Sequence, residues 1–308
     1  MIGVVFQQMM VFLTMLLVGI FAARKGLVTN EALSSINTMT QRIFLPVMVL
    51  GFVYRNLTAD AVATHWPMLP LTACFYAVAI LLALALSRIL GLRGGRACAF
   101  RLSFTFGNTG FIGLPLLAAV HGAAGVVDLM LFMVVDQVIF WTLGIREAAP
   151  AERKPSLAES LKGLANPNLI AFAIGGAVVA LGIEVPAFLA AAVDSLGAVA
   201  SPLCMVCIGC MCVYSQVARV VRQREFYVGV ALKMVLLPIA CAPLLMALPL
   251  GDGIASSLIL MMAMPATTLV PLAVAREGGD ERAATRMAVG TIAVSTLTVP
   301  LVALIAGI

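Results

Sequence analysis

Charged residues are scarce in this sequence. Of its 308 residues, only 11% are Asp, Glu, Lys or Arg, whereas 62% are hydrophobic. Because soluble domains carry about 25% charged residues, this composition excludes an ordinary soluble protein and predicts a polytopic membrane protein. The stretch before Arg24 has no charge, so it lacks the basic region of a secretory signal and is expected to be the first spanning helix.

Recognisable enzyme and metal motifs are also missing. The sequence contains no H-E-x-x-H, G-x-G-D or G-x-S-x-G motif. His65 and His121 lack metal-ligand spacing and are expected to be solvated in outer loops. Cys204, Cys207 and Cys210 lie in an apolar run without the fourth cysteine of an iron–sulfur site, so we interpret them as small packing residues. The sequence therefore predicts no enzyme, no cofactor and no metal site.

Long apolar segments are abundant. Each has close to the ~20 residues that a helix needs to cross about 30 Å of hydrocarbon. Ten such spans are predicted at residues 2–23, 33–54, 66–87, 102–120, 129–145, 169–183, 195–215, 226–250, 253–275 and 287–308. The fold class predicted is therefore an all-α polytopic membrane protein with ten transmembrane helices.

Basic residues alternate with these spans. Of the 19 Lys and Arg residues, 15 lie in the odd-numbered loops, whereas Arg55 alone lies in an even-numbered loop. The positive-inside rule then places the odd-numbered loops in the cytoplasm and both termini outside. This distribution predicts a multi-pass protein of a plasma membrane (the bacterial inner membrane) with periplasmic termini. The net charge of +5 follows this topology and does not indicate a nucleic-acid partner.

Two halves of the chain align at one offset. Pro46 precedes Pro202 by 156 residues, and Pro115 precedes Pro271 by the same number. The same offset relates Gly19 to Gly175, Gly26 to Gly182, Gly95 to Gly251 and Gly122 to Gly278. Because five helices is an odd number, residues 167–308 would form an inverted repeat of residues 1–145, joined by a cytoplasmic linker at 146–166. Inverted repeats are typical of secondary carriers, although chance alignment of small residues is the alternative.

The fourth predicted span is interrupted at its centre by Gly107–Pro115, which contains three glycines, an asparagine, a threonine and a proline. The equivalent part of the ninth span, Ala263–Pro271, also contains prolines and threonines. In hydrocarbon, a broken helix is tolerated only where protein or a water-filled cavity satisfies its backbone. We expect broken helices 4 and 9 to meet antiparallel, so that their half-helix N-termini favour an anion such as a carboxylate. The alternative is a kinked, glycine-packed helix without a ligand.

From these two interruptions the sequence predicts the residues of a substrate site. They are Asn108, Thr109, Gly110, Gly113, Pro115, Pro265, Thr267, Thr268 and Pro271. Asn108 could instead only cap the broken helix, and the two threonines could only satisfy its backbone.

Three further polar residues are candidates for ion coupling. Asp136, beside Gln137, lies in the fifth span, where a carboxylate must be paired, protonated or solvated. It could carry a coupling proton, or it could be a static partner of a cation. Lys233 lies about two turns into the eighth span and could pair with Asp136. Arg42 and Arg101 could attract an anion or extend to the membrane interface.

The motif Asn108-Thr109-x-x-x-Gly113-x-Pro115-Leu116-Leu117 resembles the fourth-helix signature of the auxin efflux carrier family, which includes plant PIN proteins and bacterial malonate- and malate-type carriers. Residues 134–141, 263–265 and 275–277 resemble its fifth and ninth helices, and the resemblance covers essentially the whole chain. It implies ten helices, with helices 4 and 9 crossing at their breaks. The long cytoplasmic loop of plant members is absent here, as in short prokaryotic forms.

The resemblance also implies how such a protein works. Helices 1, 2, 6 and 7 would form a scaffold, usually dimeric, while helices 3–5 and 8–10 would form a moving domain. The expected function is secondary active or potential-driven transport of a small organic anion by alternating access, with Asn108 contacting the substrate. Expected partners are the anion, the bilayer, H⁺ or Na⁺ as a coupling ion, and a second copy of the chain. The alternatives are a sodium-coupled carboxylate symporter and a non-transporting membrane sensor module.

Overall fold

The computed structural model describes residues 1–149, 154–215, 217–251 and 253–308, and within them the regular elements are all helical. Arg153, which was assigned to the predicted linker, lies outside the described residues. Seven helical segments of the described chain are long and apolar enough to cross a membrane, so this is a polytopic membrane protein. They are Ile2–Arg24, Asn30–Asn56, Met68–Ile89, Thr109–Ala148, Ala187–Tyr214, Arg224–Ala247 and Glu281–Ala306.

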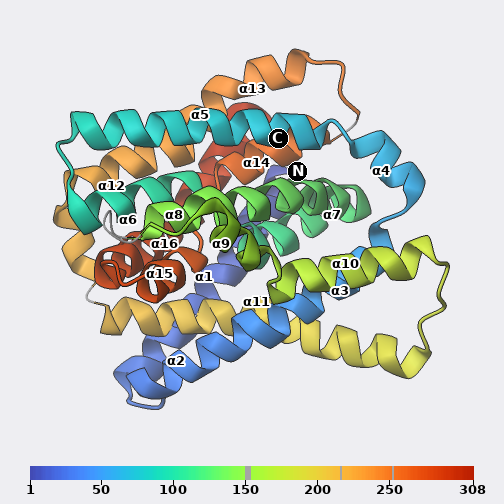
Figure 1. The fold of residues 1–308 in the computed structure, drawn as a ribbon, viewed down its shortest axis with the longest axis horizontal. Coiled ribbons are helices and arrows are strands. Elements are labelled where there is room, and N and C mark those ends of the chain that lie inside the picture. Colours follow the sequence, from blue (N-terminus) through green and yellow to red (C-terminus); the bar gives the residue numbers. More distant parts are fainter. Residues whose placement is uncertain (150–153, 216, 252) are drawn as a thin grey trace.

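The α-helices follow the chain as shown in Figure 1. They are α1 (Ile2–Arg24), α2 (Asn30–Met39), α3 (Leu45–Asn56), α4 (Ala59–His65), α5 (Met68–Ile89), α6 (Gly94–Thr105), α7 (Leu114–Ile139), α8 (Ile145–Ala148), α9 (Leu157–Leu161), α10 (Pro167–Ala180), α11 (Ala187–Tyr214), α12 (Arg224–Gly229), α13 (Leu237–Ala247), α14 (Ile254–Met262), α15 (Leu269–Arg276) and α16 (Glu281–Ala306). Short π-helical turns lie at Thr40–Phe44, Thr109–Gly113, Phe140–Gly144 and Val230–Leu236, and 3₁₀ turns at Lys162–Leu164 and Val217–Arg222.

Local sequence explains where several helices begin and end. The Asn166 side chain caps α10 by accepting hydrogen bonds from the amides of Asn168 and Leu169, and Pro167 occupies the first turn. Asp280 caps α16 in the same way through the amide of Ala283. At its other end α16 stops at Gly307, which has a φ of 73°.

The helices pack as two groups. In the first group, α1 packs along α11, and α3 contacts both α10 and α11. In the second group, α5 packs on α6 and α7, α13 packs on α14, and α16 packs on α6 and α15. In Figure 1, α2, α3, α10 and α11 lie along the lower part of the view, whereas α5, α12 and α13 lie along its upper part. Contacts of α1 with α16 and α7, and of α3 with α7, join the two groups.

Close packing within the first group depends on glycines. A Cβ atom at Gly209 of α11 would collide with the carbonyl oxygen of Leu16 in α1, and one at Gly19 would collide with the carbonyl oxygen of Val206. The two backbones therefore touch directly, as is common where small residues line a contact between membrane helices.

Two predicted spans are interrupted in the structure. α6 ends at Thr105, and helical structure resumes at Thr109; α14 ends at Met262, and α15 begins at Leu269. The 40-residue segment Thr109–Ala148 also contains a non-helical residue, Gly122, with φ 60° and ψ −137°. α10, with 14 residues, and the short α14 and α15 do not qualify as spans by length alone, so the count of ten stays a prediction.

One predicted span begins inside a longer helix. The fourth span was expected to begin at Leu102, but α6 begins at Gly94 and carries two arginines. The Arg101 Nε donates to Glu147 Oε1 at 2.8 Å, and the Arg96 Nε donates to Glu225 Oε1 at 2.9 Å. Because partner carboxylates neutralise these charges, the helix extends through residues that hydropathy alone placed in a loop.

Candidate functional site

The two interrupted segments lie against each other and pair through their backbones. The Asn108 amide donates to the Pro265 carbonyl at 2.7 Å, and the Thr267 amide donates to the Phe106 carbonyl at 3.2 Å. Between these bonds, Gly107 and Ala266 form an antiparallel bridge. A Cβ atom at Gly107 would lie 3.1 Å from the Met264 Cβ atom, so the close approach favours glycine. The predicted antiparallel meeting of the two breaks is confirmed by these bonds, and we call this region the crossing.

Asn108 starts the helical structure that follows the first break. Its Oδ1 atom accepts a hydrogen bond from the Phe111 amide at 3.3 Å, while its backbone carbonyl accepts from the amides of Ile112 and Gly113. Pro115 follows within the continuous helical segment Thr109–Ala148 and lacks an amide proton, and the Phe111 carbonyl four residues before it accepts from the Ser201 hydroxyl at 2.7 Å instead. The capping role of Asn108 uses only its oxygen.

Other elements satisfy the second break. The Ala266 amide donates to Thr291 Oγ1 of α16 at 3.1 Å. Lys233, whose side chain is buried, donates from Nζ to the carbonyl of Met264. The Thr267 Oγ1 atom accepts from the Leu269 amide at 3.3 Å. These contacts supply partners that a broken helix in hydrocarbon requires.

Three polar side-chain atoms near the crossing are buried without a hydrogen-bond partner among the described residues. They are Nδ2 of Asn108, Oγ1 of Thr268 and Oδ1 of Asn168. A buried polar atom without a partner costs about 1–3 kcal/mol, so such atoms at one place indicate a missing ligand, ion or water. The first is a donor and the third an acceptor, so the region offers both kinds of hydrogen bond.

A small cavity of about 20 Å³ lies beside Asn108. Its wall combines the crossing with two residues of the first helix group, Leu45 at the start of α3 and Asn168 of α10. The volume is about that of one water molecule and far below that of an organic anion. In this conformation the region is therefore closed, and its closure involves both helix groups.

A carboxylate network borders the same cavity. Tyr76 of α5 donates its hydroxyl to Asp136 Oδ1, and the Gln137 amide nitrogen donates to Asp136 Oδ2 at 2.9 Å. The Trp141 indole donates in turn to Gln137 Oε1 at 3.1 Å. Both Asp136 and Gln137 line the cavity, so the carboxylate lies near Asn108. The suggested ion pair with Lys233 is not formed within 4.0 Å in the part of the chain that the structure describes, because Nζ is directed to the Met264 carbonyl.

The structure brings most of the predicted site residues together. Asn108, Thr109, Gly110, Asp136, Gln137 and Thr267 all line the small cavity. The Pro265 carbonyl is held by the crossing, and Gly113 packs against Leu129. Pro115 instead borders a larger cavity, and Pro271 is buried within α15.

Sequence reasoning missed Tyr76 and Asn168. Tyr76 lies in an otherwise apolar span, and Asn168 follows a capping asparagine, so neither position shows a local pattern that distinguishes it. The expectation for the two histidines was wrong. His65 is buried and its Nδ1 lies 2.7 Å from Asp128 Oδ1, and His121 is partly buried with Nε2 3.0 Å from Ser256 Oγ. The short helix α4 folds His65 back onto α7, which removes it from solvent.

A comparison with protein families agrees with this geometry. A family model described as "Membrane transport protein" matches residues 4–303. A search of curated proteins found no match. The match covers nearly the whole chain, including both helix breaks and the carboxylate network. The chain therefore belongs to this membrane transport family, the auxin efflux carrier type that the fourth-helix motif resembles.

Proposed function

We propose that this protein is a secondary active or potential-driven carrier that moves a small organic anion, a carboxylate, by alternating access. The observation that carries the proposal is the crossing, where two broken helices pair antiparallel beside buried, unpartnered polar atoms. Discontinuous helices whose half-helix N-termini face a central site are a recurring way for secondary carriers to bind anions. The family match supports the transporter class, and the crossing supports the anion.

The proposal includes ten spanning helices arranged as two inverted repeats, residues 1–145 and 167–308, with a cytoplasmic linker at 146–166. Backbone conformation supports it, because two pairs of glycines 156 residues apart have positive φ at both positions. Gly26 and Gly182 have φ of 69° and 62°, and Gly122 and Gly278 have φ of 60° and 78°.

Helix packing supports the same repeat. Gly19 of α1 faces the carbonyl of Val206 in α11, and Gly175 of α10 faces the carbonyl of Leu50 in α3. Adding the offset of 156 residues to Gly19 and Leu50 gives Gly175 and Val206, so the two contacts are equivalent under the repeat. Chance alignment of small residues does not predict reciprocal contacts of this kind.

In this proposal the two helix groups move relative to each other. Helices 1, 2, 6 and 7 (α1–α3, α10 and α11) form the scaffold, through which two copies associate as a homodimer. Helices 3–5 and 8–10 carry the crossing and form the moving domain. The small cavity lies at their boundary, so displacement of the crossing from Leu45 and Asn168 would enlarge it. The protein would reside in a bacterial plasma membrane with both termini periplasmic.

Within the site, Asn108 binds the substrate carboxylate through Nδ2, the donor that the fold leaves unpartnered. Thr109, Gly110 and Gly113 shape the approach, and Pro265, Thr267, Thr268 and Pro271 complete the opposite side. Asp136, Gln137 and Lys233 respond to the coupling ion, H⁺ or Na⁺. Without coupling, an inside-negative potential alone would drive anion export by ~2.3 kcal/mol per charge per 100 mV.

Counterflow in proteoliposomes tests the proposal. Vesicles loaded with an unlabelled carboxylate are placed in medium containing the same labelled carboxylate, and a panel of mono- and dicarboxylates is compared. Wild type should accumulate label, Asn108→Ala should lose most of this exchange, and the exposed control Asn30→Ala should retain it. Dependence on sodium would identify a symporter, whereas absence of exchange for every anion tested would favour the sensor module.

A further inference from the structure

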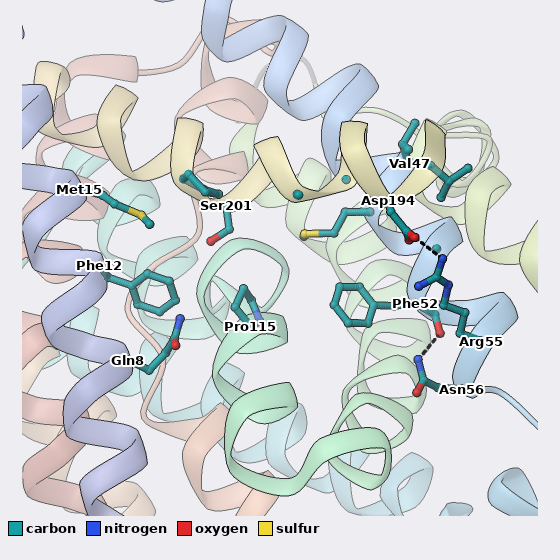
Figure 2. Close-up of a pocket in the computed structure, with 16 residues that line it drawn as sticks. Gln8, Phe12, Met15, Val47, Phe52, Arg55, Asn56, Pro115, Asp194 and Ser201 are labelled. Atoms are coloured by element: carbon teal, nitrogen blue, oxygen red, sulfur yellow. Dashed lines mark hydrogen bonds and ion pairs between the residues drawn. The ribbon is translucent and has the colours of Figure 1, made fainter. Parts of the chain in front are cut away.

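A large cavity lies between the first helix group and the start of α7. Its volume is about 530 Å³, within the roughly 300–1,000 Å³ range of small-molecule sites. Figure 2 shows its walls, with Phe12 and Met15 of α1 on one side, Phe52 and Arg55 of α3 on the other, and Ser201 and Asp194 of α11 above. Pro115 of α7 projects into its centre.

One charged pair lines this otherwise largely apolar cavity. Arg55 donates from a guanidinium nitrogen to Asp194 Oδ2, and its Nε donates to the Tyr54 hydroxyl at 2.9 Å. The two charged side chains are 44% and 48% exposed, so water reaches both. Exposed ion pairs of this kind are held weakly and exchange partners readily. The Arg55 guanidinium carbon also lies 5.3 Å from the centre of the Tyr54 ring, a contact that does not involve Asp194.

The cavity adjoins the crossing. Ser201, which lines it, donates its hydroxyl to the Phe111 carbonyl at 2.7 Å, and Phe111 also lines the small cavity beside Asn108. The segment around Phe111 therefore lies between the two cavities. α3 ends just after Arg55, and the chain enters the spanning helix α5 after the short α4. This places the charged pair at the outer side in the proposed topology.

We infer that this cavity is the outer loading site for the transported anion, with Arg55 as its carboxylate-binding residue. The inference rests on the proposed function. The substrate carboxylate replaces that of Asp194 on the Arg55 guanidinium, and its apolar part lies among Phe12, Met15 and Phe52. One carboxylate replaces another, so the guanidinium stays paired throughout. The planar guanidinium forms two parallel hydrogen bonds to a carboxylate, which favours carboxylates over neutral molecules of the same shape.

The test measures exchange from each side separately. Uptake of radiolabelled malonate, succinate and benzoate is followed in intact cells, where the outer side is loaded, and in everted vesicles, where the inner side is loaded. Arg55→Gln should raise the outer KM about ten- to a hundredfold, because a charged hydrogen-bond donor is lost, and should leave the inner KM unchanged. Asp194→Asn should lower the outer KM, since Arg55 loses its competing partner. Arg96→Gln breaks another arginine–carboxylate pair, with Glu225, away from the cavity and should change neither KM.

The outcomes separate this inference from the proposed function. If wild type exchanges none of the three anions, the carrier proposal fails as well. If wild type exchanges but Arg55→Gln and Asp194→Asn lower the maximal rate equally without a sided change in KM, the pair is a structural brace and the inference is wrong. Arg55→Lys retains the charge but not the planar fork, and an intermediate outer KM would support carboxylate binding.

Discussion

Two regions of the molecule bring backbones into direct contact: the contact between α1 and α11, and the crossing. They differ in whether all buried polar groups have hydrogen-bond partners. At the first contact, Gly19 and Gly209 have no side chains, which allows the close approach. Both helices stay continuous, so the hydrogen bonds within each helix satisfy its backbone. At the crossing the helices are broken, and the side chains of Asn108 and Thr268 keep polar atoms without a partner among the described residues. Close packing alone explains the first arrangement, whereas the second is costly unless something binds there.

The largest effect is expected from damage to the first contact. Gly209→Ala would place a Cβ atom against the Leu16 carbonyl oxygen and 2.9 Å from the Gly19 Cα atom. Both are backbone atoms, so the clash cannot be relieved by a side-chain movement. Overpacking of this kind costs about 1–3 kcal/mol or more, so the yield of folded protein and the melting temperature in detergent should fall. Gly176→Ala, where nothing lies within 4 Å, is the matched control. Equal stability of the two variants would contradict the packing account.

A single substitution at the crossing should reduce carboxylate exchange while the protein still folds. Asn108→Asp keeps the oxygen that caps the Phe111 amide but loses the unpartnered Nδ2 donor and adds a negative charge. We expect exchange of carboxylates to fall at least about tenfold, as charged hydrogen bonds contribute about 1.5–3 kcal/mol. The melting temperature of the same preparation shows whether the variant is still folded when exchange is lost. Normal exchange by this variant would show that Asn108 only caps the helix.

A substitution at Asp136 tests whether its carboxylate carries a coupling proton or has only a structural role. Asp136→Asn keeps the size of the side chain and one acceptor oxygen, for either Tyr76 or Gln137, but it cannot release a proton. The variant should lose the pH dependence of exchange while retaining part of its rate at a fixed pH. The measurement is the exchange rate across a pH series, and an unchanged profile would rule out a proton role for this carboxylate.

The smallest effect is expected at the exposed cap of α9, in the linker. The Ser156 amide donates to Glu159 Oε2 at 2.7 Å, and this backbone hydrogen bond lowers the pKa of the exposed Glu159 carboxyl. A lowered folded-state pKa means that the cap stabilises α9 above the unfolded pKa and is lost as pH falls through the folded value. The protection factors of the α9 amides, which are exchange rates corrected for the intrinsic effect of pH, should therefore fall in acid. Glu159→Gln should reduce that pH dependence, and transport should not change.

The sequence allowed the interruptions to be located before their geometry was known. Glycine, asparagine and proline within an apolar run break a helix through local backbone preference, so Gly107–Pro115 was informative by itself. The pairing partner also followed, because the prolines recur 156 residues later. Tyr76 and Asn168 could not be found this way, since their roles depend on contacts between segments far apart in the chain. The histidines show the opposite failure, where a polar residue in a short connection was assumed to be solvated although α4 packs it onto α7.

The central claim is that the crossing must separate from the first helix group during transport. A Cβ atom at Gly110 would lie 3.3 Å from a methyl carbon of Leu45, so these two positions face each other across the boundary between the groups. Oxidation of the Leu45→Cys, Gly110→Cys double variant should abolish carboxylate exchange, and reduction should restore it, while the single variants should not respond to oxidation. Undiminished exchange by the fully cross-linked protein would contradict the account.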